Sequence, residues 1–239
     1  MADTSYSRID PATGKYKHYS VNISEIIYSE DCKKMWKLCT NESERVLLSL
    51  IWHTGARPAE LVELKAKDVE WGLDRLGMPY FAIRVPTKKL GDNDGDFIIK
   101  DRILKSTRPM GREADIFIET IIRWSKHLLP EEPLMFDWTT TRSINRIMHK
   151  IANRIGKEWA PYHWRHSTMT HLAANGLGLT DLMYWKGAKS VHSVAMYLHA
   201  RPAYIAIQNI RKERDRMATE RQVTVPEQKK PDVTPEVGQ

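Results

Sequence analysis

The sequence predicts a mainly helical protein with a small antiparallel β-sheet. Apolar residues recur at helical spacing over most of the central chain, and helix caps and stops interrupt that pattern. Two strand-like stretches, 80–85 and 97–104, flank a Gly-Asp-Asn-Asp-Gly turn at 91–95. At 239 residues the chain is long enough for one sizeable core, which we expect to lie within residues 30–210.

Each helix is predicted from its own signals. The Asn-Glu-Ser-Glu run at 41–44 is typical of a capping box, and Gly55 suits the end of that helix. Pro58 suits the first turn of the next helix, which we expect to carry Leu61 through Leu64. The other expected helices begin near Ser29, cover 116–124 and 144–155, follow Arg165 up to Asn175, cover 180–186, and run from Pro202 to about Met217.

The two ends of the chain have a different character. Residues 1–29 are polar and aromatic around a turn signal at 10–14, which predicts an N-terminal arm that is either a small basic hairpin or extended. We expect residues 211–239 to hold the end of the last helix and then a disordered polar tail, since three prolines follow Arg221.

The charge agrees with a nucleic-acid-binding protein, although many basic proteins bind no acidic partner. The formal net charge is +7 with a pI near 9.3. Residues 211–239 hold seven Lys/Arg and six Asp/Glu, so +6 of this charge belongs to the expected folded part.

Several classes of protein are disfavoured. Cys32 and Cys39 are the two cysteines, so a disulfide framework is not expected, and we expect a cytoplasmic protein without a membrane span or signal peptide. His163, His166 and His171 do not have a metal-ligand spacing, so neither a metal nor another cofactor is expected.

Two arginines and a tyrosine have the chemistry of phosphodiester cleavage. Arg57 falls at a helix start, where free N–H groups already favour an anion. Arg165 offers a second planar fork of donors for phosphate oxygens. Tyr197 can attack phosphorus and form a covalent intermediate.

Three boxes carrying these residues resemble the tyrosine recombinase family of the phage-integrase type. The first is Thr-Gly-Ala-Arg-Pro-Ala-Glu-Leu at 54–61. The second is Tyr-His-Trp-Arg-His-Ser at 162–167. The third is Gly-Ala-Lys-Ser at 187–190, with Tyr197 nine residues beyond Ala188. The resemblance implies that residues 30–210 form the catalytic domain of that family.

The chain departs from the family's pattern at two positions. Tyr162 stands where the family has a histidine, and its phenol can still donate a hydrogen bond. Ala188 stands where the family has histidine or tryptophan, and its methyl group can donate none. Lys186, Lys189 and His192 remain candidates to supply the missing donor.

The resemblance implies a mechanism without metal or ATP. Tyr197 displaces the sugar 5′ oxygen and leaves a 3′-phosphotyrosine, which conserves the energy of the phosphodiester bond. Tyr204 is its close rival but breaks the spacing. Arg57 and Arg165 neutralise the non-bridging oxygens.

The leaving oxygen needs a proton, which the family takes from a lysine in a strand-to-strand turn. Lys88 fits best, with Lys89 and Lys105 as runners-up. The expected catalytic residues are thus Arg57, Lys88, Tyr162, Arg165 and Tyr197, and the expected DNA-binding residues are Arg57, Lys88, Arg165 and Lys189.

The implied function is site-specific recombination by a viral or mobile-element integrase. Its partners are a double-stranded DNA target and further copies of the chain, as a tetramer in synapsis. The segment after Pro202 either docks on a neighbouring copy or packs on its own domain. The family's separate clamp domain is not expected in the few residues before the first helix, so we expect either a catalytic-domain-only recombinase or a fragment. The alternatives are a resolvase or topoisomerase-like enzyme of the same fold, or a catalytically impaired DNA-binding protein.

Overall fold

The computed structural model describes residues 5–9, 16–87, 101–107, 115–135, 137–188 and 190–223. The chain divides into two compact units, Met1–Tyr204 and Ile205–Gln239. The first unit contains the sheet and all the helices except the second part of the last one. The helices are α1 (Ser29–Leu38), α2 (Glu42–Thr54), α3 (Pro58–Leu61), α4 (Ile116–Ser125), α5 (Thr141–Asn153), α6 (Pro161–Ala174), α7 (Leu179–Lys186) and α8 (His192–Val223).

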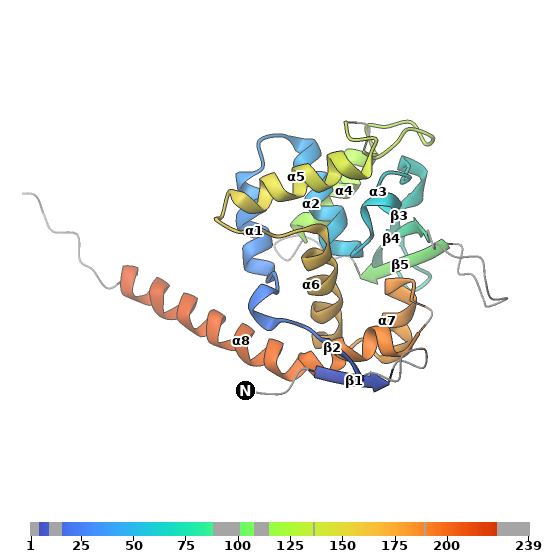
Figure 1. Cartoon of the computed structure of the whole chain (residues 1–239). Coiled ribbons are helices and arrows are strands. Elements are labelled where there is room, and N and C mark those ends of the chain that lie inside the picture. Colours follow the sequence, from blue (N-terminus) through green and yellow to red (C-terminus); the bar gives the residue numbers. More distant parts are fainter. Residues whose placement is uncertain are drawn as a thin grey trace, which may run out of the picture. The chain divides into compact units, whose positions relative to one another are not determined.

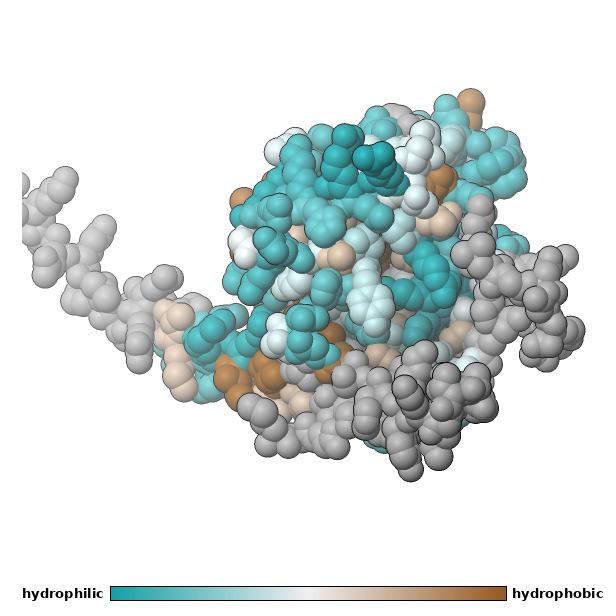
Figure 2. Space-filling view, in the orientation of Figure 1, coloured by the Kyte–Doolittle hydropathy of each residue, from teal (hydrophilic) through white to brown (hydrophobic). Residues whose placement is uncertain are grey.

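Helix α2 is the centre of the first unit. It packs against α4, α6, α1 and α5 (Figure 1). Its apolar residues are distributed around the whole helix, and Val46, Leu47, Leu50 and Ile51 are all buried. A helix that is apolar all round is stable only in a core, so the other helices assemble around this one. The face of the molecule seen in Figure 2 is largely hydrophilic by contrast.

The structure confirms the predicted ends of α2. The Asn41 side chain accepts the Glu44 backbone N–H at 2.8 Å, which closes the cap. Gly55 ends the helix in the left-handed conformation at φ 58°, where its N–H bonds the Ile51 carbonyl at 2.8 Å. The start of α3 follows at once, with Arg57 as its N-cap and Pro58 in its first turn.

The sheet has three antiparallel strands in the order β3 (Val69–Leu73), β4 (Pro79–Pro86) and β5 (Asp101–Thr107). Two of them were predicted, while β3 was missed because Val-Glu-Trp-Gly-Leu is short and holds a glycine. Residues 97–100 and the expected turn at 91–95 lie outside the described residues. Strands β1 (Ser5–Ile9) and β2 (Tyr16–Ser20) pair antiparallel, so the N-terminal segment forms the hairpin of the two alternatives.

Two helix predictions were wrong. Helix α3 ends at Leu61 instead of continuing to Leu64, because the Leu64 carbonyl accepts the Leu134 N–H at 2.8 Å and draws the chain out of the helix. Pro202 does not open a separate helix, because α8 continues through it. Tyr204, two residues later, is buried and stacks on Tyr28 at 5.0 Å, which holds the segment in place.

Candidate active site

Arg165 is held by the carbonyl ends of two helices. It lies on α6, where its Nη1 donates to the Gly55 carbonyl at 2.6 Å and its Nη2 donates to the Lys186 carbonyl. Gly55 caps the C-terminus of α2, and Lys186 is the last residue of α7. Helix C-termini carry unpaired carbonyls and partial negative charge, so both favour a guanidinium group. The ends of α2 and α7, which the sequence predicts at Gly55 and Gly187, therefore supply the carbonyls that bind this arginine.

Arg57 lies at the N-terminus of α3 and is fixed by Glu60 of the same helix. The Arg57 backbone N–H and its Nη1 each donate to the Glu60 carboxylate at 2.8 Å. The Arg57 side chain is nevertheless 39 % exposed, whereas that of Glu60 is fully buried. The guanidinium group is thus oriented by a buried acid and remains open to a ligand.

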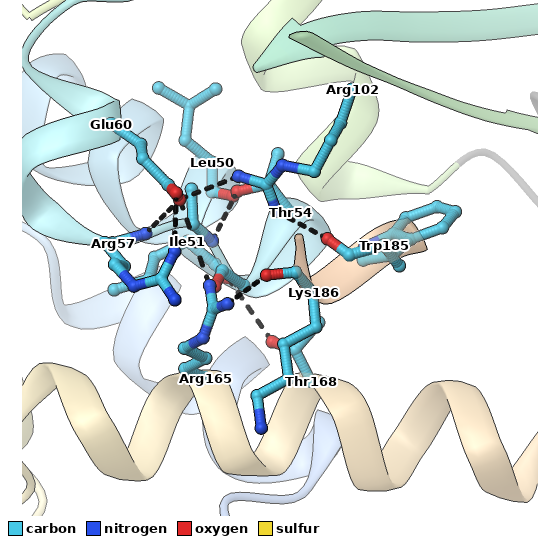
Figure 3. Close-up of polar contacts among 12 residues, drawn as sticks. Leu50, Ile51, Thr54, Arg57, Glu60, Arg102, Arg165, Thr168, Trp185 and Lys186 are labelled. Carbon is cyan, nitrogen blue, oxygen red and sulfur yellow. Dashed lines mark hydrogen bonds and ion pairs between the residues drawn. The ribbon is translucent and has the colours of Figure 1, made fainter. Parts of the chain in front are cut away.

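Glu60 also pairs with Arg102 of β5. The Nη2 of Arg102 donates to Glu60 at 2.7 Å, its Nη1 donates to the Trp185 carbonyl at 2.6 Å, and its side chain is fully buried. Arg165 lies 3.9 Å from the same carboxylate. Figure 3 shows the three guanidinium groups converging around Glu60. One buried carboxylate thereby holds together three like charges that would otherwise repel one another.

Gly187 makes room for Arg102. It follows α7 in the left-handed conformation at φ 61°, and a Cβ built on it would lie 3.1 Å from Cδ and Nε of Arg102. A side chain here is both strained and crowded. Since Arg102 and Arg165 bond the carbonyls of Trp185 and Lys186, this helix end is the point where the two arginines meet.

A cavity of about 760 Å³ opens over this cluster. Arg57, Asn145, Tyr162, Arg165, His166 and Lys186 are among its lining residues. Burial and then the charge of Arg57 lower the pKa of Arg165 to about 10, so the guanidinium stays protonated at neutral pH. The cavity is therefore lined by cations from three separate helices.

Tyr197 lies behind this cavity rather than in it. Its side chain is fully buried, and its hydroxyl has no hydrogen-bond partner among the described residues. Its ring lies 5.3 Å from that of His166, and Nζ of Lys186 lies 4.8 Å from its centroid. Burial raises the pKa of Tyr197 well above its usual value, so the side chain is a neutral phenol.

Lys186 and His166 have strongly lowered pKa values. Burial, followed by the charges of Arg165 and Arg57, lowers the pKa of Lys186 to about 7. Burial and then the Lys186 charge lower the pKa of His166 to about 3, so that this imidazole is neutral.

The expected site residues fall into three groups. Arg57, Tyr162 and Arg165 line one cavity, and Tyr197 packs against two of the residues that line it. Lys88 and Lys189, together with the runner-up Lys89, lie outside the described residues. The remaining rivals have other surroundings: Lys105 is exposed with its Nζ 4.4 Å from the Tyr80 ring centroid, and Tyr204 is buried with its hydroxyl 3.0 Å from Nδ1 of His171.

Sequence reasoning missed the pairing of Glu60 with Arg102. A signal existed, because Arg102 and Leu104 point to the same side of a strand by their spacing of two. Leu104 is a core residue, and an arginine on the core side of a strand indicates a buried acid as its partner. Only the folded chain identifies that acid as Glu60, which lies 42 residues away.

No helix among the described residues is long and apolar enough to cross a membrane. Within those same residues, no three His, Cys, Asp or Glu side chains are grouped as metal ligands. Cys32 and Cys39 are both buried free thiols.

The helical fold and the three-stranded sheet are those of tyrosine recombinase catalytic domains. The model of the phage integrase family matches residues 25–203, and the chain belongs to this family.

Curated relatives agree with this assignment. The tyrosine recombinase XerA of Thermococcus kodakarensis is 23 % identical over 198 residues, which are 82 % of this chain and 63 % of the relative. The tyrosine recombinase XerD of Listeria innocua is 25 % identical over 167 residues, which are 65 % of this chain and 50 % of the relative. The chain thus spans between a half and two thirds of the length of these relatives.

Solved structures share the fold. A crystal structure of XerA recombinase matches 78 % of this chain and 64 % of its own chain, with a TM-score of 0.54 and 19 % identity. The XerH site-specific recombinase bound to its difH substrate in a pre-cleavage complex matches 79 % of this chain and 55 % of its own, with a TM-score of 0.52 and 21 % identity.

Proposed function

We propose that the protein is a site-specific DNA recombinase that cleaves and rejoins DNA strands through a 3′-phosphotyrosine at Tyr197. The observation that supports this most directly is the shared cavity of Arg57 and Arg165, with Tyr197 packed behind its lining. Membership of the phage integrase family and the similarity to Xer recombinases support the same activity.

The proposed reaction follows from these side chains. Arg57 and Arg165 bind the two non-bridging oxygens of the scissile phosphate, where negative charge grows during the reaction. Oη of Tyr197 gives its proton to solvent water as it attacks phosphorus, the P–O5′ bond breaks, and the 5′ oxygen takes a proton that we assign to Lys88. Tyr162 lines the cavity and donates a hydrogen bond to the phosphate. Since Tyr197 is buried, it must be uncovered before it reacts.

The proposed partners are a duplex target site and further copies of the chain. The cations that line the cavity and the net charge of +7 suit a phosphodiester backbone. XerH is bound to its difH DNA in the similar structure, which is consistent with a DNA partner. We assign the reaction to the integration of a viral or mobile element in the host cytoplasm, with a tetramer in synapsis and Lys189 contacting DNA.

Covalent trapping tests the activity on many candidate target sequences at once. A library of randomised duplexes, each with a nick, is incubated with the protein. Cleavage near a nick releases a short strand, so rejoining fails and the adduct accumulates. We expect adducts with the wild-type chain and none with Tyr197→Phe, which should still bind DNA. Adducts that persist in Tyr197→Phe, or that mass spectrometry maps to Tyr204, would refute the assignment.

The burial of Tyr197 and the methyl group at Ala188 favour one other candidate, a DNA-binding protein that has lost turnover. That protein would enrich duplexes from the library without forming any adduct.

A further inference from the structure

Lys186 is a cation without a counter-ion among the described residues near it. It lies at the end of α7, lines the cavity and is half-buried. Its Nζ donates to the Ser193 carbonyl and lies over the Tyr197 ring, and both of these partners are uncharged. The charges of Arg165 and Arg57 act on it unfavourably. A partly desolvated ammonium group beside two guanidinium groups loses its proton more easily, and a nearby anion would favour its charged form.

The charged groups around Lys186 do not supply that anion. Arg57 and Glu60 of α3, Arg102 of β5 and Arg165 of α6 form the surrounding cluster, with one carboxylate for three guanidinium groups. Glu60 is already bonded to Arg57 and Arg102. Without a ligand the net charge of this cluster is +2 when Lys186 is neutral, and +3 when Lys186 is protonated and four cations face one carboxylate.

The neutral titratable groups around Lys186 do not compensate this charge either. Those groups are Tyr162 and His166 of α6 and Tyr197 of α8. Burial raises the pKa values of both phenols. Burial lowers the pKa of His166 to about 3, so this ring is uncharged near neutral pH.

We propose that Lys186 is a third phosphate-contacting residue, which takes up a proton when a DNA phosphate enters the cavity and then bonds a phosphate oxygen beside Arg57 and Arg165. This inference rests on the proposed function only for the identity of the anion as a DNA phosphate. Ala188 cannot donate the hydrogen bond that the family's histidine or tryptophan donates. Of the candidates Lys186, Lys189 and His192, the proposal assigns that role to Lys186.

The proposal has a defined pH signature. In the free protein the pKa of Lys186 is about 7, so part of the population is uncharged at neutral pH. A bound anion raises that pKa, because it favours the charged form. The complex therefore binds more protons than the free protein, and affinity falls as the pH rises through about 7. If Lys186 instead accepted the proton of Tyr197, its neutral form would be the active one, and the cleavage rate would rise with pH.

The first experiment needs no catalytic activity. The full chain, labelled with ¹³C at lysine Cε, is titrated with and without inorganic sulfate, an oxyanion whose own charge is constant in this range. We expect a lysine signal with a midpoint near pH 7 that is absent from Lys186→Arg and moves up by about one unit or more with sulfate. A midpoint in the ordinary lysine range, or one that sulfate does not move, would overturn the proposal.

The second experiment uses a duplex captured by covalent trapping, in the Tyr197→Phe background so that no cleavage occurs. From about pH 6.5 to about pH 8.5 we expect affinity to fall roughly tenfold for the chain with Lys186. Lys186→Arg should bind without this fall, and Lys186→Met should bind weakly at both pH values. The control is Lys67→Met, which removes an exposed lysine that pairs with Glu131. Its affinity for the duplex should fall with pH as much as that of the chain with Lys67.

The two proposals fail in different ways. If Lys186 only anchors α8 through the Ser193 carbonyl, Lys186→Met lowers the melting temperature and leaves the pH dependence of binding intact, which overturns the inference. If the wild-type chain forms no adduct with any duplex, the recombinase function fails, while the sulfate titration still decides the role of Lys186.

Discussion

Arg57 is oriented by the Glu60 carboxylate and Arg165 by two main-chain carbonyls, and we expect the removal of either side chain to affect the reaction more than the fold. Arg57 caps a four-residue helix, and Arg165 bonds the ends of two helices. In both cases the guanidinium group reaches the cavity with donors left over for a ligand.

We expect Arg57→Ala and Arg165→Ala each to slow single-turnover cleavage on the order of 100- to 1000-fold, as the loss of one oxyanion donor does. Duplex affinity should fall far less, because phosphate contacts elsewhere on a duplex usually supply most of the binding. The measurement is adduct formation with a captured nicked duplex. Arg84→Ala, on an exposed arginine of β4 near Asp101, is the control and should cleave normally. A loss below about fivefold for either cavity arginine would indicate a structural role.

Glu60 is the residue on which the geometry of the arginines depends. Replacing it with glutamine preserves its shape but leaves the fully buried Arg102 without a counter-ion. Breaking a buried pair from one side costs about 3–5 kcal/mol of unfolding free energy, so we expect the melting temperature of Glu60→Gln to fall by roughly 10 °C.

Glu131→Gln is the matched control for Glu60→Gln. Glu131 also pairs with two cations, Lys65 and Lys67, but its side chain is 66 % exposed. Solvent screens exposed pairs, so circular dichroism should show almost the wild-type melting curve. Equal melting temperatures for the two variants would mean that Glu60 does not stabilise the arginine cluster.

Helix ends, more than helix faces, build this site. The N-terminus of α3 presents Arg57, while the C-termini of α2 and α7 hold Arg165. Both of those C-termini end at a left-handed glycine, Gly55 and Gly187. A change at either glycine should therefore be transmitted to the arginines through a carbonyl.

Gly187→Ala and Gly156→Ala separate backbone strain from displacement of Arg102. Both glycines have positive φ, 61° and 69°, but a Cβ meets Arg102 at 3.1 Å in the first case and nothing within 4 Å in the second. Each variant should lose on the order of 1–3 kcal/mol of unfolding free energy. Only Gly187→Ala should also lose most of its single-turnover cleavage. If both variants cleave alike, the end of α7 does not position the cluster.

Local signals predicted the ends of elements well, and tertiary contacts account for the failures. Asn41, Gly55 and Pro58 act through their own neighbours in sequence, so their roles could be predicted from the chain. The shortening of α3 depends on a bond from Leu134, and the helix through Pro202 depends on the burial of Tyr204. Such contacts between distant residues are not encoded in any short window.

Some residues of the candidate site could likewise be found from local sequence patterns, and others only from the folded chain. Family boxes located Arg57, Arg165 and Tyr197, because each box is a local pattern. The roles of Glu60 and Arg102, and the meeting of Lys186 with the two cavity arginines, arise only when α3, α6, α7 and β5 come together. The burial of Tyr197 also could not be predicted, since an amphipathic helix does not reveal which side chain its neighbours cover.

The division of the chain into two units predicts where it can be shortened. The first unit ends at Tyr204, which is buried, stacks on Tyr28 and contacts His171. We expect a chain ending at Tyr204 to melt close to the full-length protein and to bind DNA, but not to complete recombination if the second unit docks on a neighbouring copy. A chain ending at Ala200 should melt at a clearly lower temperature, since it loses a core aromatic worth about 3–5 kcal/mol.

Calorimetry and light scattering with and without a captured duplex test this prediction. Full recombination by the chain ending at Tyr204, or equal melting temperatures for the two truncations, would contradict it.

The covered position of Tyr197 has a consequence for accuracy. Under the proposed function, a buried Tyr197 cannot attack the many DNA sequences that the protein meets by chance, because binding alone does not expose the nucleophile. The observed rate is then the chemical rate multiplied by the fraction of molecules in which the tyrosine is free. If a true target site raises that fraction, the preference for this site in binding is multiplied by its preference in exposing the tyrosine. In the proposed mechanism a modest preference in binding then becomes a strong preference in breakage.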